Sequence, residues 1–264
     1  MNSTQFDLLT GQTAVVTGAS GGIGRAIARL LANHGARVLL HACSRLSVAE
    51  QLATEIRAAG GVATAMAADV ACPDTCAQFV ERVWDDLERV DIWVNNAGAD
   101  VLTGEAAQLG FQAKLQRLWQ VDVQGTILLS RDVGQRMRQM GSGAILNIGW
   151  DQAATGMEGD SGEMFAATKG AIMAFTRSLA RSLAPQVRVN CVAPGWIRTS
   201  WGEQADEYWQ RRATTESLRG RWGLPEDVAR AALYLVSPAA DFVTGHVLPV
   251  NGGLAGAAPP RGDN

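Results

Sequence analysis

The sequence predicts an α/β protein, a single domain with a doubly wound, seven-stranded parallel sheet flanked by helices. Short apolar runs alternate with longer amphipathic stretches along most of the chain, which is typical of strands joined by crossover helices. A glycine-rich stretch at residues 17–24 follows the first apolar run and precedes the first amphipathic one. Strand, glycine turn and helix in that order are how a doubly wound sheet binds a dinucleotide.

Length and composition agree with this fold class. The chain has 264 residues, of which 47% are hydrophobic and 19% are charged, so it can bury a large core. No linker-like segment, charge block or internal repeat interrupts the alternation. We therefore expect residues 1–264 to form one dinucleotide-binding domain.

Charge and targeting signals limit the partners and the compartment that we expect for this protein. The formal net charge of −3 gives no electrostatic footprint for nucleic acid or an anionic membrane, so we expect a small-molecule partner. The first residues lack the pattern of a signal peptide, and no stretch reaches about 18 uncharged apolar residues, so we expect a cytoplasmic protein. Without paired metal-ligand spacing, the four cysteines are expected to be free, mostly buried thiols and no metal site is expected. They are Cys43, Cys72, Cys76 and Cys191.

The expected elements follow from the apolar periodicity. Strands are expected at 13–17, 37–42, 62–67, 91–95, 143–149, 187–193 and 246–250. Helices are expected at 23–34, 47–59, 73–88, 105–138, 163–183 and 225–236.

The glycine stretch assigns a separate role to each glycine. A backbone that passes close to a diphosphate cannot carry side chains, so Gly18, Gly22 and Gly24 would serve the turn, the close approach and the packing of helix on strand. The helix starting near Ile23 would point its free N–H groups at the phosphates. The remaining loop residues predicted to bind the cofactor are Ser20 and Gly21. A simple turn is the alternative interpretation of a lone glycine pattern.

Polar motifs follow the third and fourth expected strands. Asp69, followed by Val70, can accept a hydrogen bond from an adenine amino group, although a carboxylate there is more often a helix cap or surface turn. Residues Asn96, Ala97 and Gly98 could likewise form an ordinary turn. Because ligands of an open parallel sheet bind beyond the carboxyl ends of its strands, we expect both motifs to form a cofactor wall.

Together these motifs resemble the short-chain dehydrogenase/reductase family, over about residues 11–254. The run Pro194-Gly195-Trp196-Ile197-Arg198-Thr199 resembles the family's turn after the sixth strand, and Gly223–Ala229 with Asn251–Gly253 resembles its C-terminal portion. The resemblance implies a Rossmann fold, a nicotinamide cofactor and a homotetramer or homodimer. In the tetramer, the helices near 105–138 and 163–183 would pair across one interface and the strand near 246–250 across another. It also implies cofactor contacts from Pro194, Gly195, Ile197 and Thr199.

The end of the second strand bears on which cofactor binds. An acidic residue there would hold the ribose 2′-hydroxyl of NAD(H), but the sequence has none. Ser44 and Arg45 could instead bind a 2′-phosphate, and the alternative is a solvated arginine before a helix. Gly21 stands where a basic residue in the glycine loop would support NADP. NADP(H) is favoured and NAD(H) is the alternative.

The catalytic positions depart from the family's pattern. The family carries a Tyr-x-x-x-Lys pair, whose phenol donates a proton to the substrate carbonyl while hydride arrives. Here the matching stretch begins at Phe165 and ends at Lys169, so the lysine is present and the phenol is absent. The family's serine falls on Trp150, and its asparagine falls on Asp122. Only Lys169, the expected ribose-binding residue, is kept.

Another group would then have to supply the proton. Asp122 and Asp151 are carboxyls that a dry site could keep protonated, and a buried Lys169 could donate if its pKa fell. Each has a plainer alternative role as a helix cap, salt-bridge partner or ribose ligand. Tyr208 is the one phenol that could reach in from the lid.

Residues 196–222 resemble the family's substrate-covering lid, with amphipathic spacing that predicts one or two helices from 203 to 219. Its tryptophans, among them Trp196 and Trp201, could pack the lid or contact a ligand. With Trp150 and Phe165 below them, they would give an aromatic pocket suited to a flat or ring-bearing substrate.

Three functions remain open. The first is an NAD(P)-dependent oxidoreductase of the short-chain type, transferring hydride to or from a carbonyl, alcohol or activated double bond, with an atypical active site. The second is an NAD(P)-binding protein without redox turnover, a sensor or assembly partner. The third is a non-redox enzyme on the same fold.

Overall fold

The computed structural model describes residues 8–253. Within them, seven parallel strands form one sheet in the order β3-β2-β1-β4-β5-β6-β7. The fold class expected from the sequence is thereby confirmed. The strands are β1 (Thr13–Val16), β2 (Arg37–Ala42), β3 (Val62–Ala67), β4 (Ile92–Asn95), β5 (Gly143–Ile148), β6 (Val187–Pro194) and β7 (Val247–Val250).

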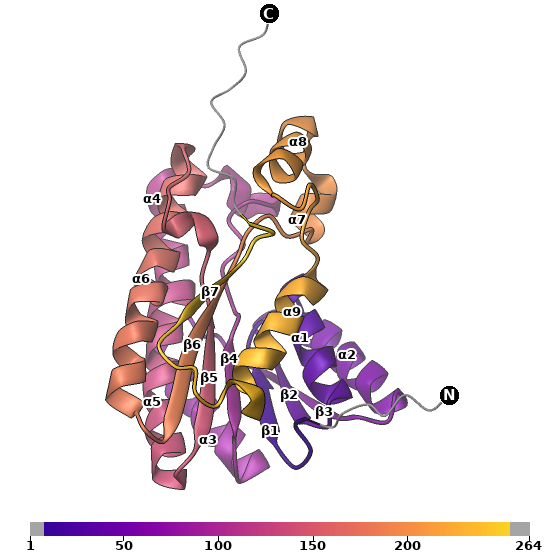
Figure 1. Ribbon diagram of the computed structural model, residues 1–264, viewed down its shortest axis with the longest axis vertical. Coiled ribbons are helices and arrows are strands. Elements are labelled where there is room, and N and C mark those ends of the chain that lie inside the picture. The colour runs from indigo at the N-terminus through magenta and orange to yellow at the C-terminus, as the bar shows by residue number, and fades with distance from the viewer. Residues whose placement is uncertain (1–7, 254–264) are drawn as a thin grey trace, which may run out of the picture.

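Helices cover both faces of the sheet (Figure 1). One face carries α1 (Gly22–Asn33), α2 (Leu46–Ala58) and α9 (Pro225–Val236). The other carries α3 (Pro73–Leu87), α5 (Thr126–Met140) and α6 (Gly159–Leu183). No helix among residues 8–253 combines the length and hydropathy needed to cross a membrane.

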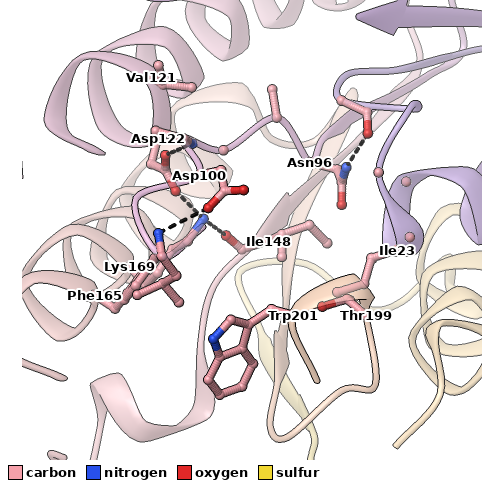
Figure 2. Close-up of a pocket in the computed structure, with 18 of the residues that line it drawn as sticks. Ile23, Asn96, Asp100, Val121, Asp122, Ile148, Phe165, Lys169, Thr199 and Trp201 are labelled. Atoms are coloured by element: carbon pink, nitrogen blue, oxygen red, sulfur yellow. Dashed lines mark hydrogen bonds and ion pairs between the residues drawn. The ribbon is translucent and has the colours of Figure 1, made fainter. Parts of the chain in front are cut away.

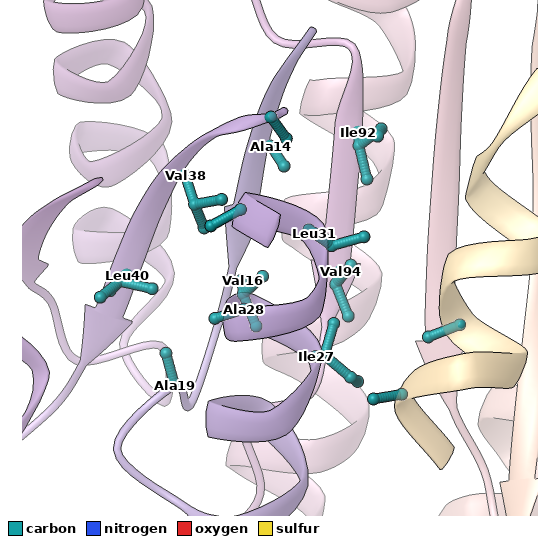
Figure 3. Packing of buried hydrophobic residues seen from close by; sticks show 14 of the residues in the cluster. Ala14, Val16, Ala19, Ile27, Ala28, Leu31, Val38, Leu40, Ile92 and Val94 are labelled. Carbon is teal, nitrogen blue, oxygen red and sulfur yellow. The ribbon is translucent and has the colours of Figure 1, made fainter. Parts of the chain in front are cut away.

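The central strands are apolar throughout because both of their faces are buried. Val16 of β1 belongs to the core on the α1 side, where it packs with Ile27 and Leu31 (Figure 3). Its neighbour Val15 points the opposite way, as alternation along a strand requires, and packs with Trp93 on the α3 side. The first helix is thereby fixed over β1, and its N-terminus meets the glycine turn.

The segment expected as one helix over 105–138 is divided, and this expectation was wrong. A 3-10 turn, Gly104–Gln108, is followed by α4 (Phe111–Leu118), by a π-helical segment, Trp119–Gly125, and then by α5. Gly110 is the N-cap of α4, so the chain breaks before that helix begins. The next helix, α6, begins at Gly159, four residues earlier than expected.

The segment 196–222 contains two short helices, α7 (Ser200–Gln204) and α8 (Glu207–Glu216), above the carboxyl edge of the sheet (Figure 1). Asp206 caps α8 by accepting a hydrogen bond from the N–H of Trp209. Two further 3-10 turns are Asp151–Ala153 and Pro238–Ala240.

Candidate active site

A cavity of about 1110 Å³ runs along the carboxyl edge of the sheet and continues under the lid. The structure brings together at its wall every residue that the sequence predicted for the cofactor. These are Gly18, Ser20, Gly21, Gly22, Ile23, Gly24, Ser44, Arg45, Asp69, Val70, Asn96, Ala97, Gly98, Lys169, Pro194, Gly195, Ile197 and Thr199. The four residues predicted for the substrate pocket also line it: Trp150, Phe165, Trp196 and Trp201.

The three glycines of the turn have different surroundings. Gly18 adopts φ +64°, and a Cβ there would lie 2.8 Å from the Cα of Ala97. A Cβ on Gly24 would lie 2.5 Å from both the Nδ2 of Asn96 and the carbonyl oxygen of Gly18. A Cβ on Gly22 would have its nearest neighbour 3.4 Å away. An added side chain would therefore fit within the protein and take up space that now belongs to the cavity. Turn, packing and close approach are thus served by separate glycines.

Thr17 and Asn96 join the glycine loop to the end of β4. The Oγ1 of Thr17 donates to the carbonyl of Val94 (3.2 Å) and accepts from the backbone N–H groups of Asn96 (2.9 Å) and Ala97 (3.0 Å). The Nδ2 of Asn96 donates to the carbonyls of Thr17 (3.0 Å) and Gly18 (3.1 Å). The side chain of Asn96 therefore holds the glycine loop in place, and its amide nitrogen donates to two backbone carbonyls.

His41, at the end of β2, is a cavity residue that the sequence analysis missed. Its Nδ1 accepts from the N–H of Gly18 (3.2 Å), so its Nε2 carries the proton that it donates to the carbonyl of Ala68 (3.0 Å). Burial lowers the pKa of His41, outweighing the carbonyl of Ala68 and the charge of Asp69. A neutral imidazole thus holds the glycine loop in position. The sequence signal that could have identified His41 is a polar residue directly after the apolar residues of β2.

These residues fit a dinucleotide. Gly22 begins α1, whose N-cap makes no side-chain hydrogen bond, so the first N–H groups of the helix are available to a diphosphate. Ser44 and Arg45 lie at the rim beside Asp69, where an adenosine ribose would end. Cys43, exposed at the same rim, has a raised pKa because of burial of its sulfur and the neighbouring Asp69.

Lys169 and Asp122 form a buried ion pair at the other end of the cavity. The Nζ of Lys169 lies 2.8 Å from the Oδ2 of Asp122 and 3.4 Å from the carbonyl oxygen of Ile148. Dashed lines mark these contacts in Figure 2. The other carboxylate oxygen of Asp122 accepts from the N–H of Ala99 (2.8 Å). Asp122 is 2% exposed as a side chain and Lys169 is 13% exposed. The π-helical segment that follows α4 presents this carboxylate to the lysine.

Phe165 stands one helical turn before Lys169 on α6, and its ring meets Trp150. The two ring centroids are 6.2 Å apart in an edge-to-face arrangement. Ser161 lies a further turn back and also lines the cavity. Its spacing of four residues from Phe165 and eight from Lys169 could have identified it from the sequence.

The lid closes the aromatic end with stacked tryptophans. Trp196 and Trp201 are stacked at 6.3 Å, and Trp209 lies 5.5 Å from Trp196 and also lines the cavity. The guanidinium of Arg212 lies over Trp196 and Trp209, at 5.8 and 5.6 Å from the ring centroids. Trp209 was not among the residues predicted for the pocket.

Ion pairs hold this lid against the body of the protein. Arg212 pairs with Glu216 on its own helix and with Glu158, the N-cap of α6, at 2.5 Å. Although burial opposes it, the hydrogen bonds that Arg212 donates to both glutamates raise its pKa. Glu216 also accepts from the Nε1 of Trp196 (2.7 Å) and the Nε2 of Gln152 (3.1 Å). The lid is therefore bonded to the start of the helix that carries Lys169.

Two predicted proton donors do not line the cavity. Asp151 is buried, accepts from the Nδ2 of Asn251 (3.1 Å) and packs behind Gly195, where a Cβ would lie 2.9 Å from its carboxylate. Burial raises its pKa to about 6, but Asp151 is not among the residues that line the cavity. Tyr208 is 57% exposed and accepts a hydrogen bond from Arg212 (3.2 Å) on the outside of the lid. The register of α8 turns its ring away.

The glycine turn, the polar strand ends and the crossing order of the sheet define a dinucleotide-binding protein of the doubly wound α/β class. Comparison with known proteins narrows this class. The family model described as "Enoyl-(Acyl carrier protein) reductase" matches residues 18–255. The chain belongs to the short-chain dehydrogenase/reductase family of oxidoreductases, and the resemblance inferred from its motifs is confirmed.

Relatives cover nearly the whole chain. A 3-oxoacyl-[acyl-carrier-protein] reductase of Synechocystis sp. is 35% identical over 250 residues, which are 93% of this chain and 98% of the relative. A 7α-hydroxysteroid dehydrogenase complexed with NADH and 7-oxo glycochenodeoxycholic acid is 31% identical, covering 97% of this chain and 99% of its own, with a TM-score of 0.86. A short chain dehydrogenase of Burkholderia cenocepacia in complex with NADP is 30% identical, covering 93% and 98%, with a TM-score of 0.84.

Proposed function

We propose that this protein is an NADP(H)-dependent oxidoreductase that transfers hydride at a site without the phenolic proton donor of its family. The observation that carries the proposal is the continuity of one cavity from the glycine turn to Lys169 and Phe165. Cofactor and substrate would meet where the helix bearing Lys169 approaches the end of β5. The nicotinamide cofactor supplies the hydride, and the residues described above supply position and electrostatics.

The choice of NADP(H) rests on the rim of the cavity. Ser44 and Arg45 offer a hydroxyl and a fork of guanidinium donors to a 2′-phosphate, with no acid among the residues that follow β2. Among the related structures one contains NADP and another NADH, so the family accepts both. The local chemistry of this chain favours the phosphorylated form.

The side chains around the reacting atoms favour a substrate that needs little help from an acid. Phe165 has no proton to give, and the ammonium of Lys169 is held by Asp122 and by the carbonyl of Ile148. Loss of a positioned acid costs a carbonyl reduction about 10² to 10⁴ in rate. A conjugated or otherwise activated acceptor avoids most of this cost.

The same ion pair favours a second candidate, a dinucleotide-binding protein without redox turnover. If Lys169 stays bound to Asp122 when the cofactor enters, the lysine serves the fold and the pocket serves recognition. Such a protein would report the cellular nucleotide state or assemble with a partner. The two candidates differ in whether hydride leaves the bound nucleotide.

Calorimetric titration and nucleotide oxidation together separate these candidates. We expect NADPH to bind more tightly than NADH, and NADPH to be oxidised slowly by simple ketones and faster by activated acceptors. Tight NADPH binding with no oxidation by any acceptor would favour the non-redox candidate. Absence of binding to either nucleotide would contradict both.

Assembly into a homotetramer or homodimer is also proposed, from the family and from exposed apolar side chains. Phe111 and Trp119 are exposed on the helical segment before α5, at one expected interface. Tyr234 on α9 and Phe242 before β7 are exposed at the other. Symmetric burial of such patches is the usual route to closed oligomers. Light scattering at micromolar concentration should give a multiple of the 28.0 kDa chain mass, and a monomeric mass would contradict the proposal.

A further inference from the structure

Three substitutions at the substrate end change its chemistry in the same direction. Phe165 replaces a phenol by an aromatic face that cannot donate a proton. Trp150 replaces a hydroxyl by a second aromatic face, packed against the first at 6.2 Å. Asp122 replaces a neutral amide by a carboxylate, 2.8 Å from the ammonium of Lys169. Together these residues remove a proton donor, add aromatic surface and add a negative charge. Each of these changes favours a cationic ligand.

The aromatic surface surrounds this end of the cavity. Trp150 and Phe165 line the cavity together with three tryptophans of the lid: Trp196, Trp201 and Trp209. The face of an indole attracts a cation within about 6 Å, and rings of aromatic side chains are how proteins recognise quaternary nitrogen. Arg212 already lies over the faces of two of these tryptophans, without being among the residues that line the cavity.

Charge at the floor permits a cation to enter. Unpaired, the ammonium of Lys169 would repel one, but Asp122 neutralises it. Asp100 adds a carboxylate to the wall, and hydrogen bonds from Thr103 and Leu102 overcome the effect of its partial burial and keep its pKa below the usual range. Among the described lining residues, the other cations are Arg117, exposed on α4, and Arg45, whose charge also lowers the pKa of Asp100.

We propose that the substrate is a ring-bearing iminium cation, which the cavity reduces to an amine. This inference rests on the proposed hydride transfer and names its substrate class. The iminium carbon gains a hydrogen with its electron pair from the reduced nicotinamide, and the C=N π pair becomes the lone pair on nitrogen. The positive charge passes to the oxidised nicotinamide. Atoms and electrons balance without a proton, so the absence of a phenol costs nothing in this step.

Binding gives the first test and needs no turnover. The probe is N-methyl-3,4-dihydroisoquinolinium, and its neutral counterpart is 3-methyl-1,2-dihydronaphthalene, which has carbon in place of the charged nitrogen. Both are titrated into the full chain saturated with a redox-inert 1,4,5,6-tetrahydronicotinamide analogue of NADPH. We expect the cation to bind at least about tenfold more tightly than the hydrocarbon. Equal affinities, or tighter binding of the hydrocarbon, would overturn the proposal.

Matched variants identify the source of that preference. Trp150→Leu removes an aromatic face but keeps an apolar side chain, so the ratio of cation to hydrocarbon affinity should fall about fivefold or more. Asp122→Asn leaves Lys169 unneutralised and should lower the same ratio. Nucleotide binding and thermal melting establish that each variant is folded. Because the ratio compares two ligands on one protein, a general loss of affinity leaves it unchanged. An unchanged ratio in both folded variants would overturn the proposal.

Turnover separates failure of this inference from failure of the proposed function. With NADPH, the ratio of kcat/KM for the iminium probe to that for 1-tetralone, a ketone of the same ring size, should be at least about 100. Phe165→Tyr should lower that ratio by accelerating the ketone alone. Reduction of tetralone as fast as the iminium would overturn the inference and leave the oxidoreductase standing. If neither is reduced by a protein that binds NADPH, both the substrate assignment and the redox function are overturned.

Discussion

The two ends of the cavity differ in what holds their residues in place. At the cofactor end, backbone atoms make the critical contacts: the carbonyl of Gly18, the N–H groups after β4 and the N-terminus of α1. At the substrate end, side chains contact side chains, as in the pair of Lys169 with Asp122 and the ring contact of Phe165 with Trp150.

This difference predicts that residues at the substrate end change more freely than residues at the cofactor end. A glycine whose Cβ would lie 2.5 Å from a backbone carbonyl cannot be replaced without moving the loop. Side chains in mutual contact can change together, provided that volume and charge are balanced. The contacts at the substrate end therefore allow Phe165, Trp150 and Asp122 to vary together in a way that the glycine turn does not.

Restoring the phenol should reduce the difference between the two ends of the cavity more than any other change. The double variant Phe165→Tyr with Trp150→Ser supplies a phenol one turn from Lys169 and a hydroxyl opposite it. We expect ketone reduction with NADPH to increase at least about tenfold, which is a part of the 10²- to 10⁴-fold contribution of general acid catalysis. The measurement is NADPH consumption against a panel of small ketones.

Lys169→Ala in the same background is the control and should abolish the gain. Replacement of the tryptophan leaves a cavity that lowers stability, so NADPH binding and melting are recorded for each variant. No gain in a folded variant that binds NADPH would mean that the substrate end cannot position a phenol.

A pair of glycine substitutions tests the cofactor end. Gly24→Ala forces a methyl against Asn96 and the carbonyl of Gly18, and overpacking of this kind costs about 1–3 kcal/mol of unfolding free energy. Gly22→Ala has room within the protein but projects into the cavity. We expect the first variant to lose stability and the second to keep it while losing affinity for NADPH. Denaturant unfolding and calorimetric titration measure the two effects, and equal stability losses would contradict the separate roles.

The buried carboxyl behind the cavity gives a prediction about pH. Burial raises the pKa of Asp151 from 3.8 to about 6, so the folded protein holds a proton that the unfolded chain releases between these values. Stability contributed by this group is therefore present at low pH and lost as pH rises from about 4 to about 6, by about 1–3 kcal/mol.

Asp151→Asn removes that titration and should flatten the decrease. The comparison is the free energy of unfolding of both proteins at several values of pH from 4 to 7. Parallel curves would mean that this carboxyl does not titrate differently in the two states.

Arg45→Ala is expected to have the smallest effect because the side chain is exposed at the rim. Loss of a charge-assisted contact to the 2′-phosphate should weaken NADPH binding by about tenfold and leave NADH binding nearly unchanged. The ratio of the two affinities, measured by titration, is the test. A parallel loss for both nucleotides would show that Arg45 supports the loop instead of the phosphate.

Strand positions could be predicted from the sequence to within about one residue because the central strands are apolar on both faces. The residues lining the cofactor end could be predicted for a related reason: they follow these strands directly. Trp150 and Phe165 were located by matching the family's catalytic pattern to the strand register and to Lys169. These last two predictions therefore needed the resemblance to the family as well as the chain's local order.

Other features depend on contacts that no local pattern encodes. The periodicity of residues 105–138 is helical almost throughout, so the break at Gly110 and the π-helical segment were hidden in it. Asp151 and Tyr208 were expected at the reaction centre because of their chemistry. Whether they point toward it depends on Asn251 and on the register of α8, which tertiary packing sets.

The π-helical segment Trp119–Gly125 joins α4 and α5, whose buried residues belong to different hydrophobic clusters. Leu118 at the end of α4 packs with Val101 and Met164, whereas Leu129 on α5 packs against the sheet. An α-helix turns about 100° per residue, so removing one residue from this segment would rotate α4 against α5 by that angle. One of the two hydrophobic contacts would be lost, and Asp122 would swing away from Lys169. Insertions and deletions in this segment are therefore constrained by the carboxylate as much as by the core.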